Sequence, residues 1–234
     1  MTQDKDTKNP IYRIQNFDRV VDIFEKNELH LSHPSIWDDP YEKYLQHPAS
    51  DSLFAQCWST NPQSDAMWRI YSPNHMGLRI RTTPEKLRNA IRSSLKENDL
   101  RYRLIDVEYL AEAELRSRTH ELTATLRNEF KPELAANSLG WKRRAFKHEE
   151  EVRLIIFRDK ITENPKDGLK IKIDPHALID DILIDPRAPK SLFEAFELYL
   201  KEKIGFKGGI SKSRLYATRE SIRVDPDEDP AADL

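Results

Sequence analysis

Short runs of alternating apolar and polar residues occur along most of the chain, which is typical of a fold that mixes strands and helices. Apolar patterning predicts strands at 11–14, 29–32, 54–59, 77–81, 102–109, 149–157, 169–173, 179–184 and 210–216. Apolar residues recur at helical spacing in 17–28, 65–71, 112–130 and 191–204, and Pro84 suits the first turn of another helix. The pattern therefore predicts the α+β class.

A dense acidic cluster, His148-Glu149-Glu150-Glu151, directly precedes the apolar strand that ends at Phe157. If the strand begins near Glu149, its period of two places Glu149, Glu151 and Arg153 on one face. Two carboxylates about 7 Å apart beside a guanidinium form a group that can do chemistry. The alternative is that the acids are solvated and Arg153 pairs with one of them.

Composition indicates a globular protein with a polar surface, because 33% of the 234 residues are charged and 38% are hydrophobic. The apolar runs are too short to span a bilayer, so no membrane partner is expected. The single cysteine, Cys57, and the polar N-terminal start favour a cytoplasmic location. The net charge of −2 gives no general attraction to nucleic acid.

The chain shows no repeats and no clear linker, so we expect one domain. Residues 1–9 and the acidic, proline-containing tail at 224–234 are expected to be disordered. The α+β domain would then cover 10–223, with a helical insertion at about 84–140. The basic runs at 142–147 and 201–214 can meet a phosphate backbone, but interleaved acids favour solvated faces.

The loop at 33–42 is rich in functional side chains, among them Trp37, Asp38, Asp39, Tyr41 and Glu42. The acids suit hard divalent metals, and together with the later glutamates they would resemble a metal-dependent nuclease. They also suit the start of a helical turn after Asp-Pro, or a clamp on a ligand. No zinc-type histidine spacing occurs, and no metal ligand is assigned.

Four segments together resemble the bacterial domain-of-unknown-function family twenty-nine seventy-one. They are the Tyr12-Arg13 strand with its helix, the 29–34 stretch with the 37–42 loop, Cys57-Trp58-Ser59 with Met67-Trp68, Tyr71 and Gly77, and the 146–153 element. The loop has an aspartate where the family usually has asparagine. The family name itself implies no activity.

A second resemblance does imply one. The order of Arg13 on the first strand, Ser59-Thr60 on a middle strand and Glu149-x-Glu151 on a late strand is similar to the arginine–serine–glutamate class of ADP-ribosyltransferases. This resemblance implies a mixed, antiparallel split sheet that holds NAD, as a substrate, across a central cleft. The long segment between Thr60 and Glu149 departs from that class.

The resemblance implies a role for each matching residue. Glu151 would stabilise the sugar cation, Glu149 would bind or deprotonate the acceptor, and Ser59 would orient the ribose or the Glu151 carboxylate. The expected NAD-binding residues are Arg13, Tyr12, Trp37, Asp39, Tyr41 and Thr60. A guanidinium suits the pyrophosphate, and aromatic rings can stack on the bases. The structural alternatives are a surface arginine, a hydroxyl bonded to the backbone, and aromatic core residues.

The leading interpretation is thus an ADP-ribosyltransferase-like enzyme, acting in a toxin or phage-defence setting. Its partners would be NAD, an acceptor that is a protein or a nucleic acid, and an antitoxin or other regulatory protein. The alternatives are a metal-dependent nuclease or other phosphoesterase, and a non-catalytic regulator that binds a nucleotide or a protein.

Overall fold

The computed structural model describes residues 8–45, 47, 50–157 and 167–218. The predicted N-terminal lead therefore lies outside the described residues except at its last two positions, and the predicted tail lies wholly outside them. Within the described part, no helix combines the length and the apolar character needed to cross a bilayer.

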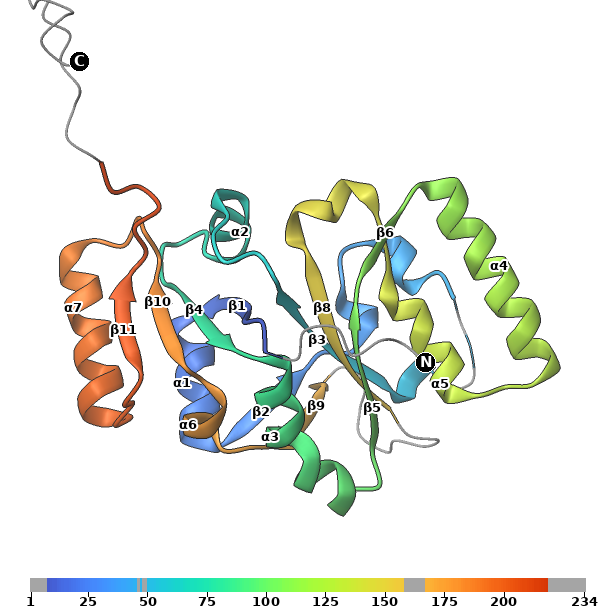
Figure 1. Cartoon of the computed structure of the whole chain (residues 1–234), viewed down its shortest axis with the longest axis horizontal. Helices are drawn as coiled ribbons and strands as arrows, with labels where there is room; N and C mark the ends of the chain where they lie inside the picture. The colour runs from blue at the N-terminus through green and yellow to red at the C-terminus, as the bar shows by residue number, and fades with distance from the viewer. Residues whose placement is uncertain (1–7, 46, 48–49, 158–166, 219–234) are drawn as a thin grey trace, which may run out of the picture.

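A seven-stranded mixed sheet is the frame of the molecule (Figure 1). Its strands, in spatial order, are β11 (Gly209–Lys212), β10 (Asp181–Ile184), β4 (Gly77–Thr82), β1 (Ile11–Asn16), β3 (Leu53–Ser59), β8 (Glu151–Phe157) and β5 (Arg101–Asp106). The β10–β11 pair is parallel and the other pairs are antiparallel. The α+β class with a mixed sheet is confirmed.

The sheet separates into two halves at its centre. β1 pairs with β4 along its whole length, from Ile11 to Asn16. β3 pairs in the same way with β8, from Leu53 to Ser59. Between the halves, β1 and β3 share one register pair among the described residues, Tyr12 with Ser59. The two strands diverge beyond that pair, which leaves room for side chains between them.

Helices and two small sheets cover the frame. The helices are α1 (Phe17–Lys26), α2 (Asp65–Tyr71), α3 (Pro84–Glu97), α4 (Glu112–Asn128), α5 (Pro132–Ala136), α6 (Pro175–Leu178) and α7 (Lys190–Leu198). The small sheets pair β2 (Glu28–Leu31) with β9 (Leu169–Lys172), and β6 (Glu108–Leu110) with β7 (Trp141–Arg143). Residues 84–140, the expected helical insertion, hold three of these helices and also supply β5 to the edge of the main sheet.

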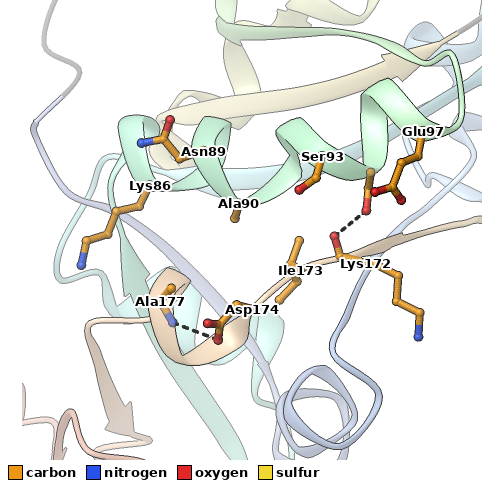
Figure 2. A pocket seen from close by; sticks show the side chains of 10 residues that line it. Lys86, Asn89, Ala90, Ser93, Glu97, Lys172, Ile173, Asp174 and Ala177 are labelled. Atoms are coloured by element: carbon orange, nitrogen blue, oxygen red, sulfur yellow. Dashed lines mark hydrogen bonds between the residues drawn. The ribbon is translucent and has the colours of Figure 1, made fainter.

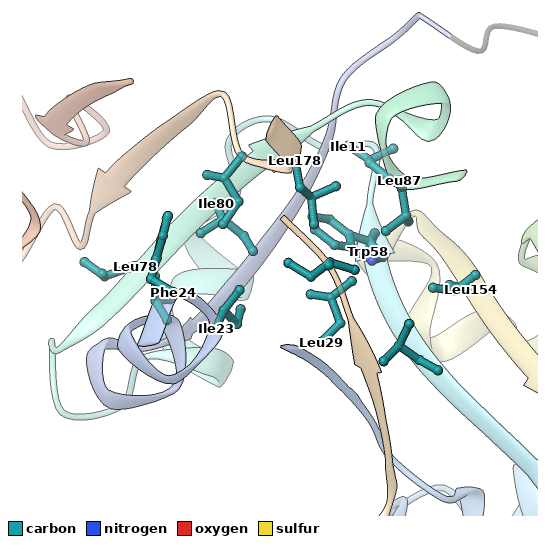
Figure 3. Packing of buried hydrophobic residues seen from close by; sticks show 14 of the residues in the cluster. Ile11, Ile23, Phe24, Leu29, Trp58, Leu78, Ile80, Leu87, Leu154 and Leu178 are labelled. Carbon is teal, nitrogen blue, oxygen red and sulfur yellow. The ribbon is translucent and has the colours of Figure 1, made fainter. Parts of the chain in front are cut away.

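The larger core lies between one face of the sheet, α1, α3 and the β2–β9 pair (Figure 3). Trp58 and Leu154 point into it from β3 and β8, and Leu78 and Ile80 from β4. The opposite face of β3 and β8 carries Ala55 and Ile155 against α5 and the turn after it, in a smaller core. Every residue of β8 is buried because both of its faces are covered.

Candidate active site

Three strands bring their polar residues to one small cavity where the sheet halves meet. Ser59 lies opposite Tyr12 on β1 and opposite Glu151 on β8. Residues directly opposite each other in an antiparallel pair share a face, so these side chains point the same way. The residues lining this cavity of about 60 Å³ include Tyr12, Arg13, Ser59 and Glu151 from the strands, and Met67 and Tyr71 from α2.

Arg13 spans the gap between β1 and β3. Its Nη1 donates a hydrogen bond to the backbone carbonyl of Cys57 on β3. The side chain thus bonds to β3 beyond the Tyr12–Ser59 register pair, where the β1 backbone is no longer paired with that strand. Burial lowers the pKa of Arg13, although the nearby Cys57, Tyr71 and Glu151 partly oppose that shift. Its Nε is buried and has no hydrogen-bond partner among the described residues. A free buried donor of this kind is available to an anionic ligand.

A larger cavity adjoins Arg13 and Tyr71 on the side of α1. Its volume is about 510 Å³, within the range of cavities that hold small molecules. Besides Arg13 and Tyr71, its polar lining includes Gln15, whose buried Nε2 is also unpartnered within the described chain, and Arg19. The two cavities together form a site that reaches from Glu151 past Arg13 to the surface beside α1.

Glu151 is a buried and ionised carboxylate. Its side chain is 5% exposed, its Oε2 accepts from Arg153 Nε at 2.7 Å, and its Oε1 accepts from Lys142 Nζ at 3.2 Å. Burial alone would raise the pKa of Glu151, but Arg153 and Lys142 outweigh it and the pKa is lowered. A fixed negative charge therefore borders the small cavity.

Glu149 does not belong to the strand, so the prediction that it shares a strand face with Glu151 is wrong. β8 begins at Glu151, and Glu150 takes a left-handed conformation with φ 44° and ψ 56° that interrupts the period of two. Glu149 instead ends a 3-10 helix, Arg144–Glu149. Its buried carboxylate still turns toward Glu151, because both accept hydrogen bonds from Lys142.

The environment of Glu149 differs from that of Glu151. Glu149 also accepts a long hydrogen bond from the Tyr71 hydroxyl at 3.4 Å, and its one cationic partner is shared. Burial raises the pKa of Glu149 to about 7, against the opposing effect of Lys142. Two adjacent carboxyl groups with pKa values pushed apart are typical of acid–base sites.

Lys142 was not predicted as a member of this charged cluster, and Glu42 was expected near the two glutamates only in the metal-dependent alternative. Lys142 was expected on a solvated basic face, and this is wrong, because its side chain is 7% exposed. Glu42, from the 3-10 turn Pro40–Lys43, forms a buried ion pair with Arg153. Trp141-Lys142-Arg143 forms a strand, so the Lys142 side chain points to the face opposite Trp141 and Arg143. This alternation is the sequence signal that could have indicated burial of Lys142 alone among the basic residues of the run.

The remaining candidates of the 33–42 loop lie beside this cluster and outside the cavity lining. Asp39 caps the turn through the backbone N–H of Tyr41 at 3.1 Å and pairs with Arg143 at 2.9 Å, so the capping alternative is confirmed for it. The Tyr41 ring lies 4.6 Å from the Arg143 guanidinium. The Trp37 ring lies 4.7 Å from the Arg153 guanidinium. Guanidinium groups thus occupy positions over both rings, and their expected role in NAD binding stays a prediction.

Tyr12 and Thr60 flank the site in different ways. Tyr12 lines the small cavity and its ring lies 4.4 Å from the Arg79 guanidinium. Thr60 is exposed, and its hydroxyl donates to the Glu150 carbonyl at 3.3 Å, so it fastens β3 to the turn before β8. Within the described residues, no group of three His, Cys, Asp or Glu side chains is arranged to hold a metal ion.

A groove of about 580 Å³ lies away from this site, between α3 and the β9–α6 segment (Figure 2). Both of its lysines pair with acids of the protein: Lys86 with Asp180 and Lys172 with Glu28. Asp174 accepts from the backbone N–H of Ala177 at 3.2 Å as a helix cap. The groove therefore offers volume, but its buried polar side chain, Ser94, already donates to the Lys172 carbonyl at 2.8 Å.

Comparison with protein families supports the first resemblance. The model of a family described as "Protein of unknown function (DUF2971)" matches residues 67–154, which confirms the resemblance over that part of the chain. The match runs from α2 to the middle of β8 and includes Glu149, Glu151 and Arg153. No curated protein matches the sequence.

Among solved structures, the chain is similar to DarT of Thermus sp. 2.9. The complex of DarT with carba-NAD+ shows 16% identity and a TM-score of 0.40, with 88% of this chain and 96% of that chain covered. The complex with ADP-ribosylated ssDNA shows 13% identity and a TM-score of 0.43, with 92% and 98% covered. Scores at this level describe a loose likeness that carries no functional conclusion.

Proposed function

We propose that the paired cavities bind NAD and that the protein is an ADP-ribosyltransferase-like enzyme. The observation that carries the proposal is the convergence of Arg13, Ser59 and Glu151, from three different strands, on one cavity. The three residues are 46 and 92 positions apart along the chain. A purely structural role for each would not require them to line the same space.

Glu151 suits the chemistry of breaking the bond between nicotinamide and ribose. That step builds positive charge on the sugar, and a fixed carboxylate beside the ribose favours it, as in glycoside hydrolysis. The two cations on Glu151 keep it ionised at neutral pH. The neighbouring Glu149, with a pKa of about 7, can take the proton that an acceptor loses.

Ser59 and Arg13 suit the binding of the donor. The buried Ser59 hydroxyl accepts from the backbone N–H of Asn61 at 3.0 Å, as the backbone-bonded alternative expects, and its own O–H can still donate to the ribose or to the Glu151 carboxylate. Arg13 lies where the small cavity meets the larger one, so its guanidinium can hold the pyrophosphate between the two ends of the dinucleotide. In this proposal the larger cavity receives the adenosine end.

The acceptor, the toxin or phage-defence setting, the antitoxin and the cytoplasmic location stay predictions.

The competing functions have less support in the geometry. Two of the three loop acids that a nuclease would use, Asp38 being the third, are held by an arginine: Asp39 by Arg143 and Glu42 by Arg153. A non-catalytic nucleotide-binding protein would use the same cavities but would not need an ionised carboxylate beside the ribose. Loss of Glu151 therefore separates that alternative from catalysis.

Calorimetric titration of the purified protein with NAD tests the proposal. We expect binding heat with the wild type, a tenfold or larger loss of affinity in Arg13→Met, and no change in Arg127→Met, which removes an exposed arginine from α4. Ser59→Ala is the milder second variant of the site. Absence of heat with the wild type, or equal affinity in all variants, would overturn the proposal.

A further inference from the structure

Lys142 occupies the centre of the buried charged cluster. It extends from β7, opposite Tyr109 of β6, and its ammonium group contacts the carboxylates of both Glu149 and Glu151. The Phe146 ring lies 4.7 Å from the ammonium nitrogen. A buried cation is costly unless it is paired, and the two carboxylates and the ring stabilise this one.

The cluster contains one more acid than base. Its acids are Glu42, Glu149 and Glu151, its bases are Lys142 and Arg153, and each of these side chains is 7% exposed or less. An uncompensated charge is costly to bury, so the cluster is most stable when one carboxyl group keeps a proton.

The contacts show which carboxyl group that is. Arg153 pairs with Glu42 and Glu151, and Lys142 with Glu149 and Glu151. Glu151 therefore has two cationic partners. Glu42 and Glu149 each share their cation with Glu151. Arg153 donates to Glu42 and Glu151 through different guanidinium nitrogens, whereas the single ammonium nitrogen of Lys142 serves both Glu149 and Glu151. Burial raises the pKa of both Glu42 and Glu149, and that of Glu149 reaches about 7.

The other titratable groups around the cluster do not change this order. Tyr71 from α2 donates to Glu149, and Tyr109 from β6 accepts from the backbone N–H of Glu151. Burial raises the pKa of both phenols and of Cys57 on β3, so all three are neutral. Arg13 from β1 is directed to the Cys57 carbonyl.

We propose that Lys142 is a positioning residue that holds Glu151 ionised and leaves the proton of the cluster on Glu149. The sequence alone would assign the two glutamates similar character, and Lys142 with Arg153 makes them different. The kinetic consequence rests on the proposed NAD chemistry, since Glu151 must be charged beside the ribose while Glu149 exchanges a proton near neutral pH. The structural statement itself does not require NAD.

The direct test is a titration of the glutamate carboxyl carbons by NMR in ¹³C-labelled protein, with Glu149→Gln to assign the Glu149 signal. In the wild type, Glu149 titrates near neutral pH. Lys142→Met should raise that midpoint by about one pH unit or more, because a cationic partner is lost. Lys142→Arg keeps the charge and should leave the midpoint nearly unchanged. Lys86→Met, which breaks a partly exposed pair with Asp180, is the matched control.

A merely structural role would give a different result. Lys142→Met would then lower the melting temperature and leave the Glu149 midpoint in place, which would overturn the proposal. If Lys142→Met does not fold, the Glu149 midpoints of the wild type and of Lys142→Arg decide whether the proposal stands. A wild-type protein in which no glutamate titrates between about pH 6 and 8 also contradicts the proposal.

A kinetic measurement separates this inference from the proposed function. If the wild type consumes NAD, Lys142→Met should lower kcat, leave KM for NAD nearly unchanged and shift the pH profile upward. If the wild type consumes no NAD, the proposed function fails, while the NMR titration still supports or overturns the role of Lys142.

Discussion

Ser59 on β3 lies directly opposite Glu151 on β8, and both side chains border the cavity at which the two halves of the sheet meet. This register places the Ser59 hydroxyl beside the ionised Glu151 carboxylate, and both residues lie on strands instead of loops. Rigid strands on both sides hold the pair more precisely than loops would. The proposed chemistry depends on this arrangement.

Arg153→Met should destabilise the protein strongly. Arg153 is 1% exposed and is the cationic partner of both Glu42 and Glu151, so its loss leaves buried negative charge without compensation. We expect a loss of about 3–5 kcal/mol in the free energy of unfolding, measured with urea. Arg69→Met removes an exposed pair with Asp65 and should leave the free energy of unfolding nearly unchanged. Similar losses in the two variants would contradict the buried network.

Glu149 should make the protein less stable as the pH rises. Its pKa is about 7 in the folded protein and about 4.3 when unfolded, so between these values the folded state holds a proton that the unfolded state has released. The free energy of unfolding therefore falls from about pH 4.3 to pH 7 and then levels off. Glu149→Gln should remove this component. Urea unfolding at several pH values checks it, and parallel curves for the two proteins would argue against a raised pKa.

Cys57 should react slowly with alkylating reagents. Burial raises the pKa of its thiol to about 11, so thiolate is scarce at pH 8. We expect alkylation at least about a hundredfold slower than for a free cysteine, and normal once the protein is unfolded in denaturant. Mass spectrometry of timed samples measures the rate. Labelling of the native protein at the rate of free cysteine would show that the thiol is accessible and ionised.

Gly77→Ala should destabilise the junction of α2 and β4. A Cβ at this position would lie 2.4 Å from the Cβ of Ser72, which is itself fixed by a hydrogen bond to Asp185. Overpacking of this kind costs about 1–3 kcal/mol. The control is Gly209→Ala on β11, where the nearest atom would be 3.7 Å away, an ordinary contact. Thermal unfolding distinguishes the two, and equal melting temperatures would refute the steric argument.

Most of the fold could be predicted because its signals are local. The apolar run of β8 and the spacing of Val20, Val21 and Phe24 in α1 each depend on neighbouring residues. The order Arg13, Ser59, Glu151 also identified residues that the structure brings together. The stretch before β8 was harder, since the left-handed conformation of Glu150 shifts Glu149 off the strand and nothing in the residue type requires it.

The ion pairs of the loop acids could not be predicted, because they are long-range. Glu42 and Arg153 are 111 positions apart, and Asp39 and Arg143 are 104 apart. A lysine in a basic run such as 142–147 is solvated in most proteins, and only the packing of β7 beneath the turn at 144–149 buries Lys142. Tertiary structure fixes such partners, and the only trace of them in the sequence is the alternation at Trp141-Lys142-Arg143.

Release of nicotinamide from NAD shows whether the Glu151 carboxylate takes part in the reaction. It is measured with the wild-type protein and with Glu151→Gln, in the presence of a cell extract that supplies acceptors. Glutamine keeps the shape of the side chain and removes its charge. We predict release by the wild type and a loss of about a hundredfold or more in the variant, which should still bind NAD. Equal release by both proteins, or none by the wild type, would contradict an account in which Glu151 stabilises the sugar cation.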